Sequence, residues 1–460
     1  MPSSETMLAA VGVVVREHGE QGWLVGGSVR DREFGRFSPD IDIVVTGDAE
    51  AVARRTAQLL DVPWFTLSEE HRAYRVVGEV AHVDIAAVRG GSILSDLAER
   101  DFTVNAMAIP VGGSELIDPF GGLGDLRARR LRAVSSRIFD DDPLRLMRAA
   151  RFATQFGLEP DGGSLRTIRA HADLLWRAAP ERIANELFLT LAGRQARSAT
   201  VCWDAMGLLP RLFPEVAARG EPSPAALSRL AELTFVGGRA SPLFPVAEEL
   251  LRERLHEPVD GAVDRRTALQ FAGLLWGLDP AEACQVGRRL KLSNALLSLL
   301  ETSARMSRWK HAGLSCAPGS GFKMADGTLA GPRDPADRAA VLFLWDASPW
   351  EPEVIILAAS AGPIDRDDAG SLELDELPFE DTLAPGIMVA RRLMALWATR
   401  EVEGVPHLPF DGDDLMRELK LEPGPLLGQA LRGAKLAWEA GEVATAEEAL
   451  KAARAAVGQA

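Results

Sequence analysis

The sequence predicts an α+β protein, with a mixed sheet and helices over residues 1–135 and an almost wholly helical remainder. Two observations predict this division. Short apolar segments in the first part alternate with polar residues at the period of a strand, most clearly at 40–45. From Pro143 onward, apolar residues recur at helical spacing. Because 460 residues exceed what one hydrophobic core usually holds, we expect several domains.

The same patterning predicts the individual elements. In chain order we expect a helix in the first 20 residues, a strand at 22–25, a short helix at 29–35, a strand at 40–45, a helix at 49–60, and strands at 74–77 and 82–88. The domains expected are a head at 1–135, a neck at 136–215, a helical body at 216–380 and a helical tail at 381–460. The acidic segment 365–381 is interpreted as a linker.

Composition excludes several classes of protein. Apolar residues make up 47% of the chain and charged residues 25%, so it is neither low-complexity nor disordered overall. Its three cysteines lie far apart, which argues against a disulfide framework or a cysteine zinc site and fits a reducing cytosol. Neither a membrane-spanning run nor a signal peptide is recognisable. We therefore expect a cytoplasmic protein without membrane contact or an obligate protein partner.

Charge is distributed unevenly along the chain. The net charge is −15, which is unusual for a nucleic-acid-binding protein. Eight arginines nevertheless occur between Arg127 and Arg151, and no lysine precedes Lys291. Genome composition can produce such a bias, but arginine also binds phosphates and base edges through two parallel hydrogen bonds. We therefore expect a local positive patch on a negative molecule.

Asp40 and Asp42 are the first candidates for chemistry. They are two residues apart on a predicted strand, so their side chains share one face while Ile41, Ile43 and Val45 face the core. Two neighbouring carboxylates repel each other, and a hard divalent cation such as Mg²⁺ relieves that repulsion. Taken alone, the pair is a weak signal and is better explained as an Asx turn at the start of a strand.

A glycine pair stands between the strand at 22–25 and the helix that follows it. Gly26 and Gly27 let backbone N–H groups approach a phosphate, and a helix N-terminus favours an anion. Arg30 adds a positive charge. A dinucleotide-binding loop is disfavoured because the GxGxxG pattern is absent. A phosphate cradle followed by paired carboxylates is what metal-assisted nucleotidyl transfer requires.

Five motifs occur in order between about residues 20 and 190: LVGGSVRD with DIDIVV, RDFTVNAMA, DPFGGLGDL, DDPLRLMRAARFA and ERIANEL. Together they resemble the bacterial tRNA nucleotidyltransferase and poly(A) polymerase family, the class II branch of the polymerase-β-type nucleotidyltransferases. Residues 408–450 are similar to the family's tail. The likeness implies template-independent addition of nucleotides to a tRNA 3′ end. We expect the motifs at 118–126 and 181–187 to be structural.

The resemblance implies roles for individual residues. Asp40 and Asp42 would hold Mg²⁺, and Asp84, on the strand at 82–88, is either a third carboxylate or an ordinary surface residue. The triphosphate would be bound by the residues of the glycine turn, which are Gly26, Gly27, Ser28 and Arg30. The ribose would be read by Arg100, Asp101 and Asn105, whose polar groups suit a 2′-hydroxyl.

Asp142 and Arg145 would select the base. Cytosine and adenine each offer an amino donor beside a ring-nitrogen acceptor, whereas uracil and guanine offer the reverse, so a carboxylate beside a guanidinium would admit C and A. Arg148 and Arg151 lie on the same helix face as Arg145 and would support it or bind the triphosphate. A simpler interpretation makes Asp142 a helix N-cap before Pro143 and the arginines a solvated stripe.

The chain departs from the family pattern at three places. Glu99 replaces an arginine, and Asp141 replaces a glutamate. Only residues 90–99 separate Arg89 from Arg100, whereas members that add all three nucleotides carry a longer loop there. Members that add only the two cytidines resemble the short form. We therefore expect CMP transfer from CTP, with CC addition favoured over addition of the final A.

Alternative functions remain open at this stage. One is a full CCA-adding enzyme that uses both CTP and ATP, and another is a poly(A) polymerase. A non-catalytic RNA-binding relative would need a broken carboxylate pair, and a Rossmann dehydrogenase would need the missing glycine fingerprint. None of the seven histidines is adjacent to an aspartate, so a fused metal-dependent phosphohydrolase domain is not expected. The expected partner is tRNA, through its acceptor stem and 3′ end.

Overall fold

The computed structural model describes residues 3–33, 35, 39–192, 196–219, 247–307, 335–361 and 385–458. The expected linker at 365–381 lies outside these residues. The chain forms two compact units, the first made of residues 1–190 and 198–212 and the second of residues 191–197 and 213–460. The division into head, neck, body and tail stays a prediction.

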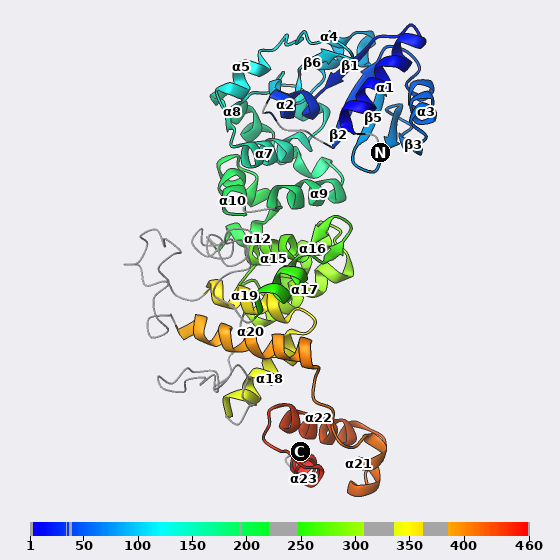
Figure 1. Cartoon of the computed structure of the whole chain (residues 1–460). Helices are drawn as coiled ribbons and strands as arrows, with labels where there is room; N and C mark the ends of the chain where they lie inside the picture. The colour runs from blue at the N-terminus through cyan, green and yellow to red at the C-terminus, as the bar shows by residue number, and fades with distance from the viewer. Residues whose placement is uncertain are drawn as a thin grey trace, which may run out of the picture. The chain divides into compact units, whose positions relative to one another are not determined.

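The first unit is built on a six-stranded sheet (Figure 1). Its strands are β1 (Gly22–Val25), β2 (Asp40–Val45), β3 (Trp64–Ser68), β4 (Ala73–Val77), β5 (His82–Ala87) and β6 (Ala108–Pro110). They lie in the order β3-β4-β5-β2-β1-β6, and only β2 and β5 run parallel. The mixed sheet expected from the sequence is therefore confirmed, although β3 and β6 were not foreseen. The first is an exposed edge strand without clear alternation, and the second has three residues.

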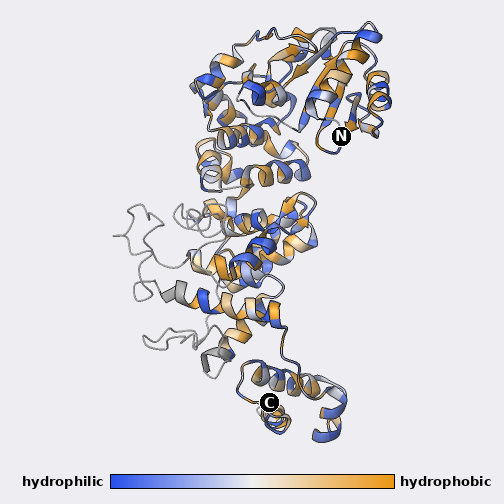
Figure 2. Ribbon diagram, in the orientation of Figure 1, coloured by the Kyte–Doolittle hydropathy of each residue, from blue (hydrophilic) through white to orange (hydrophobic). Residues whose placement is uncertain are grey.

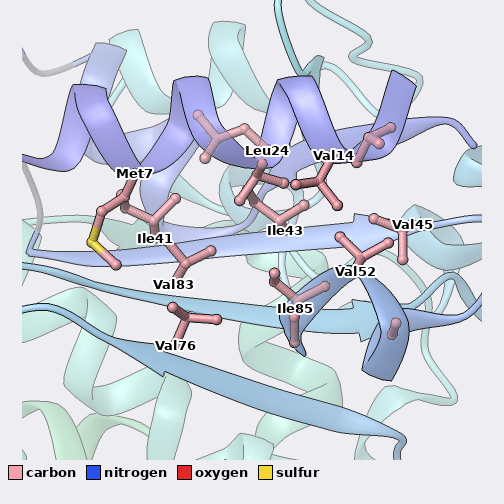
Figure 3. Packing of buried hydrophobic residues seen from close by; sticks show 14 of the residues in the cluster. Met7, Val14, Leu24, Ile41, Ile43, Val45, Val52, Val76, Val83 and Ile85 are labelled. Carbon is pink, nitrogen blue, oxygen red and sulfur yellow. The ribbon is translucent and has the colours of Figure 1, made fainter. Parts of the chain in front are cut away.

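Two helices cover one face of this sheet. They are α1 (Ser4–Glu17) and α3 (Ala49–Leu60), and the side chains of Ser3 and Asp48 cap their N-termini. Figure 3 shows α1 lying across the strands, with Met7 and Val14 directed at the apolar side chains of the sheet. Ile41, Ile43 and Val45 are buried there, as their alternation predicts. Asp40, Asp42 and Val44 consequently face the other side.

The opposite face of the sheet carries a smaller apolar cluster and the candidate site. In that cluster, Val25 and Val44 pack with Leu97 of α4 (Ile93–Ala98). The helix α2 (Gly27–Glu33) follows β1 directly. The remaining helices up to residue 212 are α5 (Gly122–Arg127), α6 (Ile138–Asp141), α7 (Arg145–Phe156), α8 (Gly162–His171), α9 (Pro180–Leu191), α10 (Ala196–Ala205) and α11 (Leu209–Leu212), and β7 (Arg130–Leu131) pairs with β8 (Glu159–Pro160).

The second unit is helical, as expected. Its helices are α12 (Pro214–Ala217), α14 (Glu248–His256), α15 (Arg265–Leu274), α16 (Pro280–Arg289), α17 (Asn294–Met306), α18 (Pro335–Ala347), α19 (Glu351–Ala361), α20 (Pro385–Glu403), α21 (Gly412–Leu419), α22 (Pro425–Glu439) and α23 (Ala446–Gly458). One short hairpin, β9 (Pro258–Asp260) with β10 (Val263–Asp264), departs from the all-helical expectation. Hydrophobic and hydrophilic residues alternate along these elements (Figure 2), as in amphipathic helices that bury one face.

None of the described helices is both long and apolar enough to span a membrane.

We predict that Ile43→Ala destabilises the first unit by about 2–5 kcal/mol, because the side chain is buried between the sheet and its covering helices. Denaturant unfolding measures this loss. Val80→Ala is the control, since Val80 is 63% exposed and its removal should cost no more than about 0.5 kcal/mol. Equal losses in the two variants would contradict this assignment of the core.

Candidate active site

The turn between β1 and α2 requires glycine at its first position. Gly26 has a φ of +64°, which L side chains rarely adopt, and a Cβ there would lie 2.8 Å from Nη1 of Arg100. Ser28 then ties the turn to β2, because its Oγ donates to the carbonyl of Asp40 and accepts from the N–H of Asp42. The glycine turn thus lies directly beside the carboxylate strand, as its predicted role requires.

Asp42 and Asp84 lie opposite each other on the parallel strands β2 and β5. Burial raises the pKa of Asp42 above its ordinary value, and the negative charge of Asp84 raises it further. Asp84 accepts two hydrogen bonds of 2.7 Å from Arg75, which stands opposite it on β4. Among the described residues no hydrogen bond reaches the carboxylate of Asp42. Asp42 is therefore the carboxylate of this group whose charge is least compensated.

Asp40 has different surroundings from Asp42. Its side chain is 60% exposed and forms an ion pair with His82 at the start of β5. Of the two predicted metal ligands, Asp42 lines the site cavity, and Asp40 is absent from the described residues that line it. In the described part of the chain, no three His, Cys, Asp or Glu side chains are grouped to hold a metal ion. The donor set still suits a hard cation, because the carboxylates of Asp42 and Asp84 lie opposite each other and the charges of Asp84 and Asp40 raise the pKa of Asp42.

A cavity of about 560 Å³ brings most of the predicted residues together. The side chains that line it come from the glycine turn, β2, β5, the segment after α4, α7 and α9. Its predicted members are Gly26, Gly27, Arg30, Asp42, Asp84, Arg100, Asp101, Asn105, Asp142, Arg145, Arg148 and Arg151. Ser28 and Asp40 are the predicted residues that do not line it. A volume of this size is typical of small-molecule sites.

Asp101 and Asn105 are bonded to protein groups within this cavity. Asp101 accepts from Nε of Arg148 at 2.8 Å, from Nδ2 of Asn105 at 3.0 Å and from the N–H of Phe102 at 2.8 Å. Burial alone would raise its pKa, but Arg148 and these hydrogen bonds outweigh burial and lower it. Asn105 in turn accepts from Nη1 of Arg30 at 2.7 Å. The polar groups expected to read a ribose are thus held by partners within the protein.

Three arginines surround the ring of Phe152. The guanidinium carbons of Arg151, Arg148 and Arg30 lie 4.5, 5.1 and 5.5 Å from the ring centroid. Burial lowers the pKa of Arg30, against the opposing effect of Asp31. These cations line the cavity, where they suit an anionic ligand.

The predicted base-selecting residues lie at the start of α7. Asp142 accepts from the N–H of Leu144, and its side chain lines the cavity. The simpler interpretation of Asp142 as a helix N-cap is wrong, because Leu144 is the N-cap of α7 and no side chain caps that helix. Arg145 donates from Nη2 to the carbonyl of Glu99 at 2.8 Å. Burial lowers the pKa of Arg145. The structure therefore brings the carboxylate and the guanidinium to the same cavity.

Sequence reasoning missed several residues that hold the site together. Asp96 is buried and accepts from Nε of both Arg89 and Arg100, at 2.8 and 2.9 Å. Its spacing of four from Arg100 was an available signal, although no helix was predicted there. Glu186 pairs with Arg151, and Arg182 with Asp142, from α9, which was given a structural interpretation. Arg75, the partner of Asp84, carried no signal, because strand pairing alone brings them together.

Some arginines of the predicted positive patch form ion pairs within the protein, and others are exposed. Arg130 and Arg132 pair with Asp125, at 3.6 and 2.8 Å. Arg127 and Arg129 are exposed. The patch therefore offers cations at the surface of the first unit, and its role in binding RNA stays a prediction.

Comparisons with known proteins assign the chain to a family. Residues 22–132 match the family described as the poly(A) polymerase head domain, and residues 157–219 match that described as a probable RNA- and SrmB-binding site of polymerase A. A CC-adding tRNA nucleotidyltransferase of Geobacter sulfurreducens is 33% identical over 451 residues, covering 97% of this chain and 94% of its own. An A-adding tRNA nucleotidyltransferase of Deinococcus radiodurans is 33% identical over 439 residues, covering 93% of each chain.

A solved structure described as a CCA-adding enzyme in complex with ATP has the same fold. It is 20% identical with a TM-score of 0.64, covering 99% of this chain and 96% of its own. The chain therefore belongs to the tRNA nucleotidyltransferase and poly(A) polymerase family, as its motifs indicate. The predictions of an enzyme and of this fold class are confirmed.

We predict that Asp101→Asn lowers the free energy of unfolding by about 1.5–3 kcal/mol at pH 7, because it removes charged hydrogen bonds to Arg148. The folded-state pKa of Asp101 is depressed, so its contribution is present above the unfolded pKa of about 3.9 and is lost as the pH falls through the folded pKa. Urea unfolding at several pH values measures this dependence.

Asp173→Asn is the control for this experiment. Asp173 is 79% exposed in its ion pair with Arg211, and such pairs contribute about 0–1 kcal/mol. A difference between wild type and Asp101→Asn that stays constant down to pH 3 would contradict the pairing of Asp101 with Arg148.

Proposed function

We propose that this chain transfers CMP from CTP to the 3′-hydroxyl of tRNA and releases pyrophosphate. One observation carries the proposal: a single cavity is lined both by the glycine turn and Asp42 and by Asp142 and Arg145. This lining supports the proposal, because it combines groups that suit a triphosphate with a donor–acceptor pair that suits a base. The relatives named as CC-adding and A-adding tRNA nucleotidyltransferases support the class of reaction and the tRNA substrate.

The reaction forms a bond between the 3′-oxygen of the RNA and the α-phosphorus, and breaks the bond from that phosphorus to pyrophosphate. Arg100, held beside Gly26, and the cations around Phe152 bind the negative triphosphate and orient it. Asp42 and Asp40 would hold Mg²⁺. When bound, such an ion lowers the pKa of the attacking hydroxyl and neutralises charge on the leaving pyrophosphate.

Selection of the base follows from Asp142 and Arg145. The carboxylate of Asp142 accepts a hydrogen bond from the amino group of cytosine, and the guanidinium of Arg145 donates one to the ring nitrogen. Uracil presents a carbonyl and an N–H at these positions, so it meets an acceptor with an acceptor and a donor with a donor. Each correct bidentate pair contributes about 1–3 kcal/mol of discrimination.

The contact of Arg145 with Glu99 favours addition of C over A. The short segment 90–99 ends at Glu99, whose carbonyl accepts from Arg145 at 2.8 Å. The same segment is anchored by Asp96, which binds Arg89 and Arg100. A guanidinium tied to an anchored segment has little freedom to move for the larger purine. An enzyme that also adds the final A is the second candidate. It is favoured by the A-adding relative, which is 33% identical to this chain, as is the CC-adding relative.

The activity assay uses purified protein, Mg²⁺ and tRNA that either lacks its CCA end or ends in CC. We predict incorporation of labelled C onto the first substrate and at least tenfold slower incorporation of A onto the second, because Arg145 is held by Glu99. Efficient addition of A to the CC end would identify the second candidate. Lack of incorporation from either nucleotide would refute the proposed function altogether.

Asp42→Asn should lower kcat by about 10³-fold or more at pH 7.5, because the variant removes the charged oxygen ligand without changing the size of the side chain. Glu79→Gln, on the bend after β4, is the control and should keep wild-type turnover. Retention of activity in Asp42→Asn would remove the assignment.

A further inference from the structure

Arg182 contacts the carboxylate proposed to read the base. Its Nη2 donates to Oδ2 of Asp142 at 3.0 Å, and both side chains line the cavity. The other oxygen of Asp142, Oδ1, accepts from the N–H of Leu144 at 3.1 Å. Each carboxylate oxygen of Asp142 therefore accepts from a different donor, and the two contacts together determine the orientation of the carboxylate.

The place of Arg182 in its helix is unfavourable without this partner. It lies in the first turn of α9, where the helix dipole disfavours a cation. One turn later, Glu186 accepts from Arg151 and lies 3.6 Å from Arg148. The helix α9 thus carries Arg182 and Glu186 four residues apart. Arg182 pairs with Asp142, and Glu186 pairs with Arg151 and lies near Arg148.

We propose that Arg182 is a positioning residue for base selection, which holds Asp142 in the orientation that accepts the amino group of an incoming nucleotide. This inference rests on the proposed function. An ionised carboxylate oxygen has lone pairs for more than one donor, so Oδ2 can accept from Arg182 and from a base together. Without Arg182, Asp142 is held through Oδ1 alone, and its side chain is free to rotate away from the base.

The test compares kcat/KM for CTP and UTP on tRNA without its CCA end. Arg182→Ala should lower the CTP-over-UTP ratio about tenfold, mainly through a raised KM for CTP, because recognition of the amino group is what weakens. Arg182→Lys, which keeps the charge but not the planar fork, should restore part of the ratio. Arg211→Ala is the matched control and should leave the ratio unchanged. Arg211 forms a similar ion pair with Asp173 in the same unit, at 2.9 Å, away from the cavity-lining residues.

A double-mutant cycle separates positioning from a general structural role. If Arg182 acts through Asp142, then Asp142→Asn and the double variant Asp142→Asn/Arg182→Ala should show the same CTP-over-UTP ratio. An unchanged ratio in Arg182→Ala, or a further fall of the ratio in the double variant, would overturn the proposal. A wild-type protein that incorporates no C would instead overturn the proposed function on which it rests.

Discussion

The ion pair between Asp101 and Arg148 is the contact on which the arrangement of the site depends. It joins the segment after α4 to α7, and both Asp101 and Arg148 line the cavity. Asp101 is almost wholly buried, so its charge is tolerated only because Arg148, Asn105 and a backbone N–H all donate to it. One buried charge therefore ties two elements that line the cavity to each other.

The cavity combines many cations with few free anions. Arg148 and Arg151 share Glu186, Arg89 and Arg100 share Asp96, and Arg148 also pairs with Asp101, so three carboxylates serve four guanidinium groups. Packing of the arginines around Phe152 lets several lie close together, because the ring face attracts each of them. A surplus of positive charge inside a protein of net charge −15 suits a triphosphate and concentrates the anion at the site.

Much of the head could be predicted from residue order alone. Alternation placed β2 at 40–45 and helical periodicity placed α3 at 49–60, because both elements bury one face against a single core. The exposed edge strand β3 was missed because most of its residues face solvent, so its sequence lacks an alternation of apolar and polar residues. The motifs also identified most of the residues that line the cavity, yet their partners Arg75 and Glu186 lie on other elements and escaped notice.

By itself the sequence determined the fold class, the family and most of the predicted residues that line the cavity, because these depend on local periodicity and on short motifs. Only the tertiary structure decided which partners neutralise the charges of those residues. Strand register set Asp84 against both Asp42 and Arg75, and the packing of α9 on α7 brought Arg182 to Asp142 (Figure 1). Such pairings join residues far apart in the chain, and their electrostatic energy depends on distance and burial, which no local pattern of residues specifies.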